Sequence, residues 1–569
     1  MTSLALKLTS PNDGENHVVK ALMVVGGMVW LILCILGLVG YSGSKVAYAV
    51  LSVVTGIMLI AGCWRSTSYG YAFLTVFLWL GLWLKLTVHT IFNYPFVEPV
   101  GSFHGGGQAW DEVVNVATVA SLGVILAKLI FNLVRRRTGE LRVDLTPTAP
   151  PWFASSRKWL WFGLILVGGA TFFINMRYGI HQIGMVPKTI LLWPLNAGIA
   201  WLLNIGLATG VAIILWWDMA LKRSLVFPIH AIIVEALISS ASILSRAAYI
   251  FHTIPQLWVA YRFRHVFTGW SNVKSLVLVG SFAFFFAISI SFVTTLRNYL
   301  YQSGAYSSTS YQIANVRVES LSGAIPMLEQ RLKSGGSQAN IFALREELRK
   351  LQDEKLKQED IMAREKMMSN AATQSGSVQS TLLLNEFGYQ ITGAFSKQIM
   401  QLSVDRWIGL EGLMAVQSYP EKDMYFFWRA LTTSPEVGAR DIYETISNSI
   451  YLKSDPKKFR FGTLPGAAAF LYYSNSQLVV VLGMTFFSLV VLYTEVLISA
   501  LIGNPILCSL YGGVMASNVA QFGVSPRQSL PSFYMLACGI FLAWSIHTHW
   551  FTRVVLRGSR RDSGKLRGG

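Results

Sequence analysis

Apolar residues in this chain gather into long runs that are separated by short polar connections. Several runs reach the roughly 20 residues that an α-helix needs to cross the hydrocarbon core of a bilayer. We expect membrane-spanning helices near residues 21–41, 46–63, 70–92, 112–134, 158–176, 190–217, 225–242, 247–262, 275–294, 477–500, 505–522 and 531–551. The pattern predicts an all-α fold, a polytopic membrane helical bundle of about 12 transmembrane helices.

The apolar region at 225–258 can be read as one crossing or as two. It is longer than one untilted crossing needs at a rise of about 1.5 Å per residue. One crossing would place the basic C-terminus on the opposite side from the other basic segments, whereas two crossings with a turn at "SSASILSR" place them together. We therefore expect two crossings, with a re-entrant helix at 247–262 as the alternative.

Composition and charge agree with a membrane protein. The chain is 53% hydrophobic and 13% charged, with a mean hydropathy of +0.46. Its net charge is +18, yet residues 297–461 hold 20 of the 47 Lys and Arg together with 18 of the 29 Asp and Glu. The surplus lies in short connections such as "RRRTGELRVDLTPTAPPWFASSRKW" and in the tail "FTRVVLRGSRRDSGKLRGG", which the positive-inside rule places in the cytoplasm. The charge is a topology signal, and we expect no nucleic-acid partner.

These signals divide the chain into five parts. We expect a cytoplasmic N-terminus at 1–20, a transmembrane bundle at 21–295, an extracytoplasmic and mainly helical domain at 296–475, C-terminal transmembrane helices at 476–552 and a basic cytoplasmic tail at 553–569. Within the extracytoplasmic domain, leucines at helical spacing on both sides of Gly335–Gly336 predict a charged helical hairpin, or a short coiled coil, at 320–372. This hairpin is either a solvated structural element or an arm that docks a partner.

Three arginines fall at or near the outer face in this topology, namely Arg177, Arg246 and Arg406. A guanidinium binds phosphate oxygens through two donors at once and stays charged when partly desolvated. We interpret the three as binding residues for a phosphate or diphosphate. Arg246 stands out because it interrupts an apolar run, although a salt bridge to Glu235 is a structural alternative.

Four further side chains are candidates for acid–base chemistry or for buried ion pairs. Glu411, in the glycine-bracketed "GLEGL", is a candidate general base, and His181 is a second one. Glu235 is a weaker base, and Glu495 within an apolar run is expected to pair with a cation. The chain lacks a G-x-S-x-G motif, a P-loop, metal-ligand spacings such as H-E-x-x-H and paired cysteine motifs, so we expect neither metal nor cofactor.

Four stretches together resemble a known class of enzyme. They are "INMRYGIHQIGMVPKTILLWPLNAGIAWLLN", "EALISSASILSRAAYIFH", "DRWIGLEGLMAVQSY" and "LPGAAAFLYYSNSQ". In this order they resemble blocks of bacterial O-antigen or oligosaccharide repeat-unit polymerases, over residues 170–530. The chain departs from the related O-antigen ligases, because it has no clear version of their His-containing loop motif.

The resemblance implies a multi-pass enzyme of the bacterial inner membrane with an extracytoplasmic active face. It implies a glycosyltransferase that moves a glycan from undecaprenyl diphosphate to the next lipid-linked repeat unit, with a chain-length regulator protein as a further partner. Arg177, Arg246 and Arg406 would bind the diphosphate or the glycan, and Glu411 or His181 would act as the base. The competing interpretations are a transporter or flippase of lipid-linked or anionic cargo, an O-antigen ligase, and a scaffold that docks a regulator through the hairpin.

Overall fold

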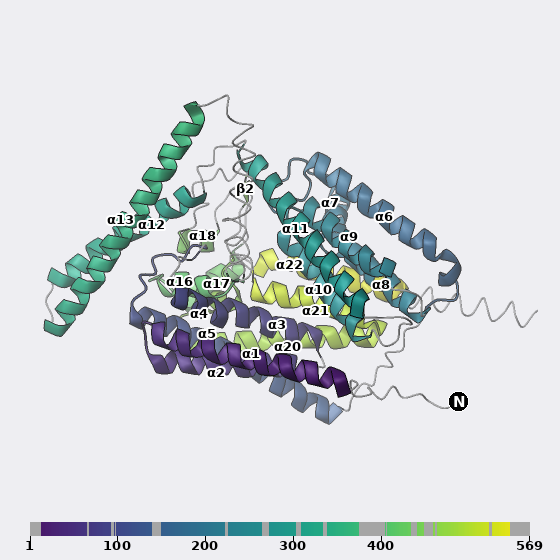
Figure 1. Ribbon diagram of the computed structural model, residues 1–569, viewed down its shortest axis with the longest axis horizontal. Helices are drawn as coiled ribbons and strands as arrows, with labels where there is room; N and C mark the ends of the chain where they lie inside the picture. Colours follow the sequence, from purple (N-terminus) through teal and green to yellow (C-terminus); the bar gives the residue numbers. More distant parts are fainter. Residues whose placement is uncertain are drawn as a thin grey trace, which may run out of the picture.

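The computed structural model of the chain is almost entirely helical, as the apolar pattern predicts (Figure 1). It describes residues 13–64, 68–92, 96, 98–138, 149–221, 226–263, 272–302, 309–333, 338–374, 404, 407–433, 441–448, 459–460, 464–522 and 526–546. Among these residues the only strands are β1 (Gly184–Met185) and β2 (Phe459–Arg460), which pair antiparallel. The prediction of an all-α bundle is confirmed.

Helices of 8 to 32 residues form the body of the bundle. They are α1 (Asp13–Gly40), α2 (Lys45–Cys63), α3 (Tyr69–Leu78), α4 (Lys85–Phe92), α5 (Gly107–Thr138), α6 (Phe153–Tyr178), α7 (Trp193–Trp201), α8 (Leu207–Ala220), α9 (Val226–Ser242), α10 (Arg246–Arg262), α11 (Asn272–Gln302), α20 (Gln477–Ile502), α21 (Pro505–Ala520) and α22 (Pro526–Ser545). Between α11 and α20 lie α12 (Thr309–Lys333), α13 (Gln338–Gln374), α16 (Leu410–Gln417), α17 (Met424–Thr432), α18 (Ile442–Ile446) and α19 (Ala467–Tyr472).

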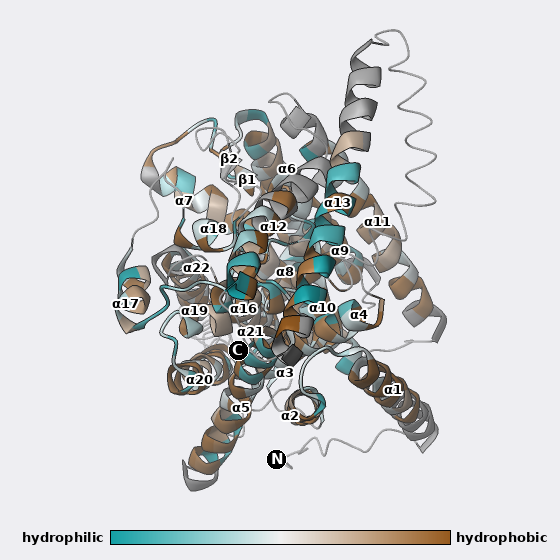
Figure 2. Ribbon diagram, turned by 90° about the vertical axis from the view of Figure 1, so that its left-hand side faces the viewer, coloured by the Kyte–Doolittle hydropathy of each residue, from teal (hydrophilic) through white to brown (hydrophobic). Residues whose placement is uncertain are grey.

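Seven helical segments of the described residues are long and apolar enough to cross a membrane. They are Lys45–Cys63, Tyr69–Phe92, Gly107–Arg135, Phe153–Tyr178, Pro194–Ala220, Leu276–Arg297 and Gln477–Ile502. Shorter apolar helices lie at Val24–Gly40, Pro228–Ser242, Pro505–Ala520 and Leu530–Ser545. The exposed side chains of α1, α2 and α5 include many apolar ones, as surfaces in contact with lipid tails require. Figure 2 colours these helices as mainly hydrophobic. The helices are those of a multi-pass membrane protein, while the full set of 12 crossings stays a prediction.

Small residues let the central helices meet at backbone distance. A Cβ on Gly512 of α21 would lie 2.8 Å from the Cα of Gly70 in α3, so neither position has room for a side chain. Gly123 of α5 is similarly close to the Val481 carbonyl of α20. Close approach of this kind is how helices gain packing energy inside a bilayer, where the hydrophobic effect between helices is weak.

Two π-helical turns interrupt the long helices. Turn η1 (Trp79–Leu84) separates α3 from α4, and turn η2 (Leu202–Gly206) separates α7 from α8. A π-turn inserts one extra residue, so it redirects the side chains that follow and leaves a backbone carbonyl available to another partner. Lys85 directly follows η1, and Asn204 lies within η2.

The charged hairpin projects from one end of the bundle. Helices α12 and α13 pack along each other (Figure 1) through Leu321, Leu328 and Leu351, with Leu344 and Leu348 beside them. One of its contacts with the remainder of the chain joins Glu347 to His104, whose Nδ1 lies 3.5 Å from the Glu347 Oε1. This contact attaches α13 to the loop between α4 and α5.

Loops from distant parts of the sequence meet at this same end. The Ser44 backbone N–H donates to Asp111 Oδ1 at 2.7 Å, and the Gly101 N–H donates to the Ser447 carbonyl at 2.9 Å. Likewise the Ile183 N–H donates to the Ile243 carbonyl at 2.9 Å. These bonds join the α1–α2 connection to the start of α5, the α4–α5 connection to the end of α18, and the α6–α7 connection to the α9–α10 connection.

Candidate functional site

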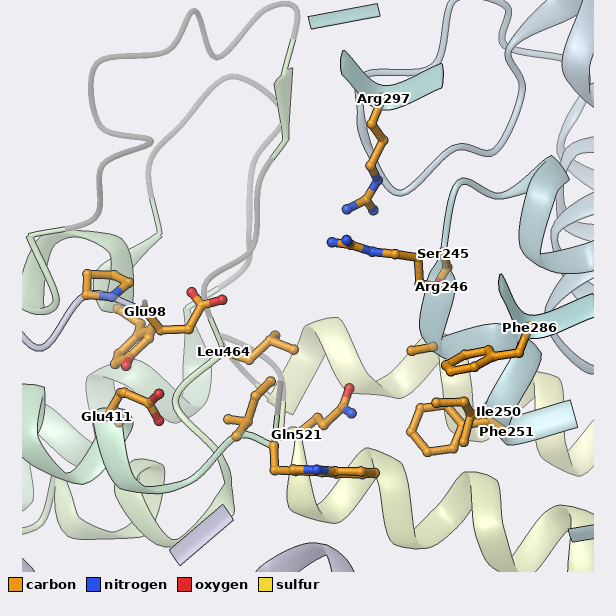
Figure 3. Close-up of a pocket in the computed structure, with 16 residues that line it drawn as sticks. Glu98, Ser245, Arg246, Ile250, Phe251, Phe286, Arg297, Glu411, Leu464 and Gln521 are labelled. Carbon is orange, nitrogen blue, oxygen red and sulfur yellow. The ribbon is translucent and has the colours of Figure 1, made fainter. Parts of the chain in front are cut away.

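A cavity of about 200 Å³ lies where α10 and α11 face α16. Its polar lining comes mainly from Glu98, Arg246, Arg297, Glu411 and Gln521, which belong to five separate segments of the chain. Figure 3 shows the arginines on one side and the two carboxylates on the other. The cavity is therefore divided into a basic wall and an acidic wall.

The basic wall is built by the ends of two helices. Arg246 is the first residue of α10 and follows a tight turn in which Leu244 has φ 57°. Its Nη1 donates to Thr294 Oγ1 of α11 at 3.4 Å, one turn before Arg297 on the same helix. The guanidinium groups of Arg246 and Arg297 point into the same space (Figure 3). Two fixed forks of donors converging on one cavity form an anion-binding geometry.

The acidic wall centres on a buried ion pair. Lys85 Nζ donates to Glu411 Oε1 at 2.5 Å, and the exposed fractions of the two side chains are 0% and 4%. Lys85 reaches this position because η1 redirects the helix immediately before it. Such a pair resists disruption, because removing one partner leaves the other charge buried and uncompensated.

The glycines that bracket Glu411 explain how α16 fits against the bundle. Gly409 has φ +152°, a conformation that side chains rarely adopt, and it provides the break before α16. A Cβ on Gly412 would lie 1.9 Å from the Pro465 carbonyl oxygen, so only glycine allows this approach. The glycines of "GLEGL" therefore allow the close packing that holds Glu411 beside Lys85.

Glu411 combines features that suit a proton acceptor. Burial raises the pKa of its carboxyl, the Lys85 ammonium acts in the opposite direction, and the nearby Glu98 adds to the rise. A carboxylate whose pKa is moved upward is a better base near neutral pH than an ordinary glutamate. Because Glu411 lines the cavity, a hydroxyl bound there could transfer its proton to this carboxylate.

The remaining lining is largely apolar and aromatic. Ile250 and Phe251 of α10 and Phe286 of α11 lie beside the arginines (Figure 3). Trp407 completes this part and stacks on Phe77, with ring centroids 5.4 Å apart. The cavity thus pairs a charged part with an apolar part, as a ligand with a charged group next to a hydrocarbon chain requires.

The structure brings together two of the five residues that the sequence singled out. Arg246 and Glu411 both line the cavity. Arg177 ends α6 with an exposed side chain over the Tyr178 ring, and it is not among the lining residues. Arg406 lies outside the described residues.

His181, the second candidate base, is held in the α6–α7 loop by two asparagines. Its backbone N–H donates to Asn175 Oδ1 at 2.7 Å, and its Nε2 lies 3.0 Å from the Asn204 amide nitrogen. Burial lowers the pKa of the His181 imidazole, while the bond to Asn204 opposes this. Burial thus favours neutral His181, whose Nε2 can accept from the Asn204 amide, and His181 does not line the cavity.

Two acids have partners other than those expected. Glu235 bonds to Ser239 and His252, so the salt bridge to Arg246 weighed as an alternative is not formed. Glu495 accepts hydrogen bonds from the Ser68 hydroxyl at 2.7 Å and from the first N–H groups of α3 at 2.9 Å. The direct contacts of Glu495 are thus with the positive end of a helix. The cation expected beside it is Lys128, which interacts with Glu495 electrostatically and forms no hydrogen bond to it.

Three lining or supporting residues were missed at the sequence level. Lys85 interrupts an apolar run as Arg246 does, and Arg297 follows the apolar run of α11, so the intramembrane-charge signal could have found both. Glu98 lies in a connection with no distinguishing pattern. Within the part of the chain that the structure describes, no three His, Cys, Asp or Glu residues cluster in a way that could hold a metal ion.

Comparisons with models of protein families, with curated proteins and with solved structures find no match to this chain.

Proposed function

We propose that the protein polymerises lipid-linked oligosaccharide repeat units at the outer face of the bacterial inner membrane. In this proposal it is a glycosyltransferase whose donor is a glycan on undecaprenyl diphosphate. The acceptor is a sugar hydroxyl of a second lipid-linked repeat unit, and undecaprenyl diphosphate is released. The observation that carries the proposal is the convergence of Arg246 and Arg297 on a cavity that Glu411 also lines.

The chemistry assigns one task to each wall. The bond between the sugar anomeric carbon and the diphosphate oxygen breaks, and the electron pair leaves with the diphosphate. Guanidinium groups of Arg246 and Arg297 stabilise this growing negative charge, which is stronger in the transition state than in the ground state. The acceptor hydroxyl forms the new bond to the anomeric carbon, and its proton passes to Glu411, which Lys85 holds in place.

The apolar part of the cavity supports a lipid-borne donor. Ile250, Phe251 and Phe286 would contact the first isoprene units while the arginines hold the diphosphate. Aromatic and aliphatic side chains next to a charged group distinguish such a donor from a free nucleotide sugar, whose diphosphate joins polar groups at both ends.

The proposal includes a topology. The chain crosses the membrane 12 times, with both termini in the cytoplasm. An even number of crossings is required, because only then do the basic connection before α6 and the basic C-terminal tail both lie inside. The end that holds the cavity then faces outward together with the hairpin of α12 and α13 (Figure 1). We propose the hairpin as the contact for a chain-length regulator.

Glycan analysis of a deletion strain tests the proposal. We expect the strain to accumulate single repeat units on the lipid carrier in the outer leaflet. Complementation with Arg246→Ala or Arg297→Ala at wild-type abundance should leave this defect. Arg429→Ala is the matched control, because Arg429 is an exposed cation of α17 that does not line the cavity. Intermediates trapped on the inner leaflet would indicate a flippase, and polymer that fails to reach its final acceptor would indicate a ligase.

A further inference from the structure

Glu235 and His252 form a second polar site inside the bundle, and neither residue lines the cavity. Their exposed fractions are 7% and 2%, and Glu235 Oε1 lies 3.0 Å from His252 Nδ1. The pair joins α9 to α10 inside the bundle. Ionisable side chains at such positions are expensive, so their presence indicates a function.

The π-turn η2 fixes one hydrogen of the imidazole. His252 Nε2 lies 2.9 Å from the carbonyl oxygen of Asn204, which lies within η2. A carbonyl can only accept, so Nε2 carries a hydrogen. His252 Nδ1 is then an acceptor when the ring is neutral, and a second donor only when the ring is charged.

The contacts of Glu235 favour its neutral form. Oε1 accepts from the Ser239 hydroxyl at 2.7 Å, whereas Oε2 is buried with no hydrogen-bond partner among the described residues. A buried carboxylate oxygen without a donor is far less favourable than the carbonyl oxygen of a carboxylic acid. Glu495 is the contrast within the same bundle, since three donors reach its two oxygens.

Among the described residues, His252 is the one charged or titratable group that forms a hydrogen bond or salt bridge with Glu235. Helices α6, α8, α10 and α11 and turn η2 pack against α9. The described charged side chains on these elements are Arg157, Lys158, Arg177, Asp218, Arg246, Arg262 and Arg297, and His230 is on α9 itself. The hydrogen bonds of Glu235 go instead to Ser239 and His252, and His181 approaches the site only through Asn204.

We propose that Glu235 holds a proton and donates it to neutral His252, which makes the pair a proton-binding site inside the bundle. The site then has no net charge, and the Glu235 oxygen without a hydrogen-bond partner is the carbonyl oxygen of a carboxylic acid. Moving the proton from Glu235 Oε1 to His252 Nδ1 breaks one O–H bond, forms one N–H bond and gives an ion pair without exchange with solvent. A movement that brings a donor or water to Oε2 favours the ion pair, so the site couples the position of one proton to the packing of α9, α10 and η2.

Infrared spectroscopy of the full chain in lipid nanodiscs tests this proposal. We expect a band of a protonated carboxylic acid at neutral pH that is lost in Glu235→Gln and shifted in Ser239→Ala, which removes the hydroxyl donor. Glu495→Gln should leave this band in place. A difference spectrum between the wild type and Glu235→Gln that contains only carboxylate bands would overturn the proposal.

The unfolding temperature of Glu235→Gln and the difference spectrum of Ser239→Ala provide two further tests. The amide that Glu235→Gln introduces can donate to Nδ1 as the acid does, so this variant should unfold at the wild-type temperature when the pair is neutral. A marked drop at neutral pH would mean that a charged His252 had lost its counter-ion, which contradicts the proposal. Should Glu235→Gln not fold, the Ser239→Ala difference spectrum decides, since it shifts a carboxylic-acid band under the proposal and a carboxylate band otherwise.

Discussion

Arg246 and Arg297 give the strongest prediction for single residues, which concerns the rate of glycan extension. A hydrogen bond between charged groups contributes about 1.5–3 kcal/mol, and about 1.4 kcal/mol corresponds to a tenfold rate change. We therefore expect Arg246→Ala to slow glycan extension about 10- to 100-fold in membranes supplied with lipid-linked repeat units. Arg246→Lys should extend the glycan at a rate between those of the wild type and Arg246→Ala, because an ammonium keeps the charge but lacks the fork of donors. Extension by Arg246→Ala at the wild-type rate would exclude the basic wall from the reaction.

Lys85 and Glu411 give a prediction that separates stability from activity. Lys85→Met leaves a carboxylate buried without a counter-ion, which should lower the free energy of unfolding by about 3–5 kcal/mol. The double variant Lys85→Met/Glu411→Gln should regain most of that stability, since neither charge remains. It should not regain glycan extension, because the proton acceptor is gone. Unfolding in detergent and extension in membranes measure the two effects, and a Lys85→Met protein as stable as the wild type would contradict the buried pair.

His181 predicts how acid affects the folded state. Burial lowers the pKa of His181 in the folded chain below the usual value of about 6.5, which holds in the unfolded chain. At a pH between the folded and the unfolded pKa, the unfolded chain therefore binds more protons than the folded chain. The stability that neutral His181 contributes is therefore complete above about pH 6.5 and declines as the pH falls toward the folded value. His181→Gln keeps an acceptor for Asn204 but cannot titrate. Unfolding free energies between about pH 7.5 and about pH 5 should fall more for the wild type than for His181→Gln, and parallel curves would refute this assignment.

At the scale of elements, the sequence predicts helices well and their irregularities poorly. The run at 46–63 becomes α2 (Lys45–Cys63), and the run at 477–500 becomes α20 (Gln477–Ile502). These matches follow from length and hydropathy, which decide whether a segment can lie in a bilayer. The π-turns η1 and η2 leave no such signal, because they depend on packing against distant helices. They nevertheless place Lys85 and Asn204, so the positions of these two side chains could not be predicted from the apolar pattern.

Gly412 allows a direct test of how α16 is fitted. Gly412→Ala would place a methyl group in collision with the Pro465 carbonyl, so α16 must shift and carry Glu411 away from Lys85. We expect lower thermal stability and a loss of glycan extension. The matched control is Gly280→Ala in α11, where a Cβ would meet nothing within 4 Å and a helical alanine is favoured by about 1 kcal/mol. Equal behaviour of the two variants would mean that α16 does not depend on this approach.

At the scale of the whole molecule, the charge pattern predicts which end faces the cytoplasm. Ser102 lies in the loop beside the cavity, whereas Ser155 lies at the start of α6, next to the basic connection. In a background without the four native cysteines, Ser102→Cys should react with an impermeant thiol reagent added to intact cells. Ser155→Cys should react only after the membrane is opened. Labelling of both positions from the same side would overturn the proposed topology.

The assembled site shows why its full composition could not be predicted. The charged residues of the site come from segments up to hundreds of residues apart, and the fold alone makes them neighbours. They are Lys85, Glu98, Arg246, Arg297 and Glu411. Arg246 could be singled out because a cation in an apolar run has few structural explanations. Arg177 carried a similar signal but has an exposed side chain beside Tyr178, so charge at the outer face is not sufficient evidence of a site.

Binding of the lipid carrier to the purified protein tests the central claim most directly. We would measure the affinity of undecaprenyl diphosphate and of undecaprenyl monophosphate for the wild type and for Arg246→Ala/Arg297→Ala in nanodiscs. The account predicts that the wild type prefers the diphosphate by at least about tenfold and that the double variant loses this preference. Equal affinities of the wild type and the double variant for the diphosphate would contradict it.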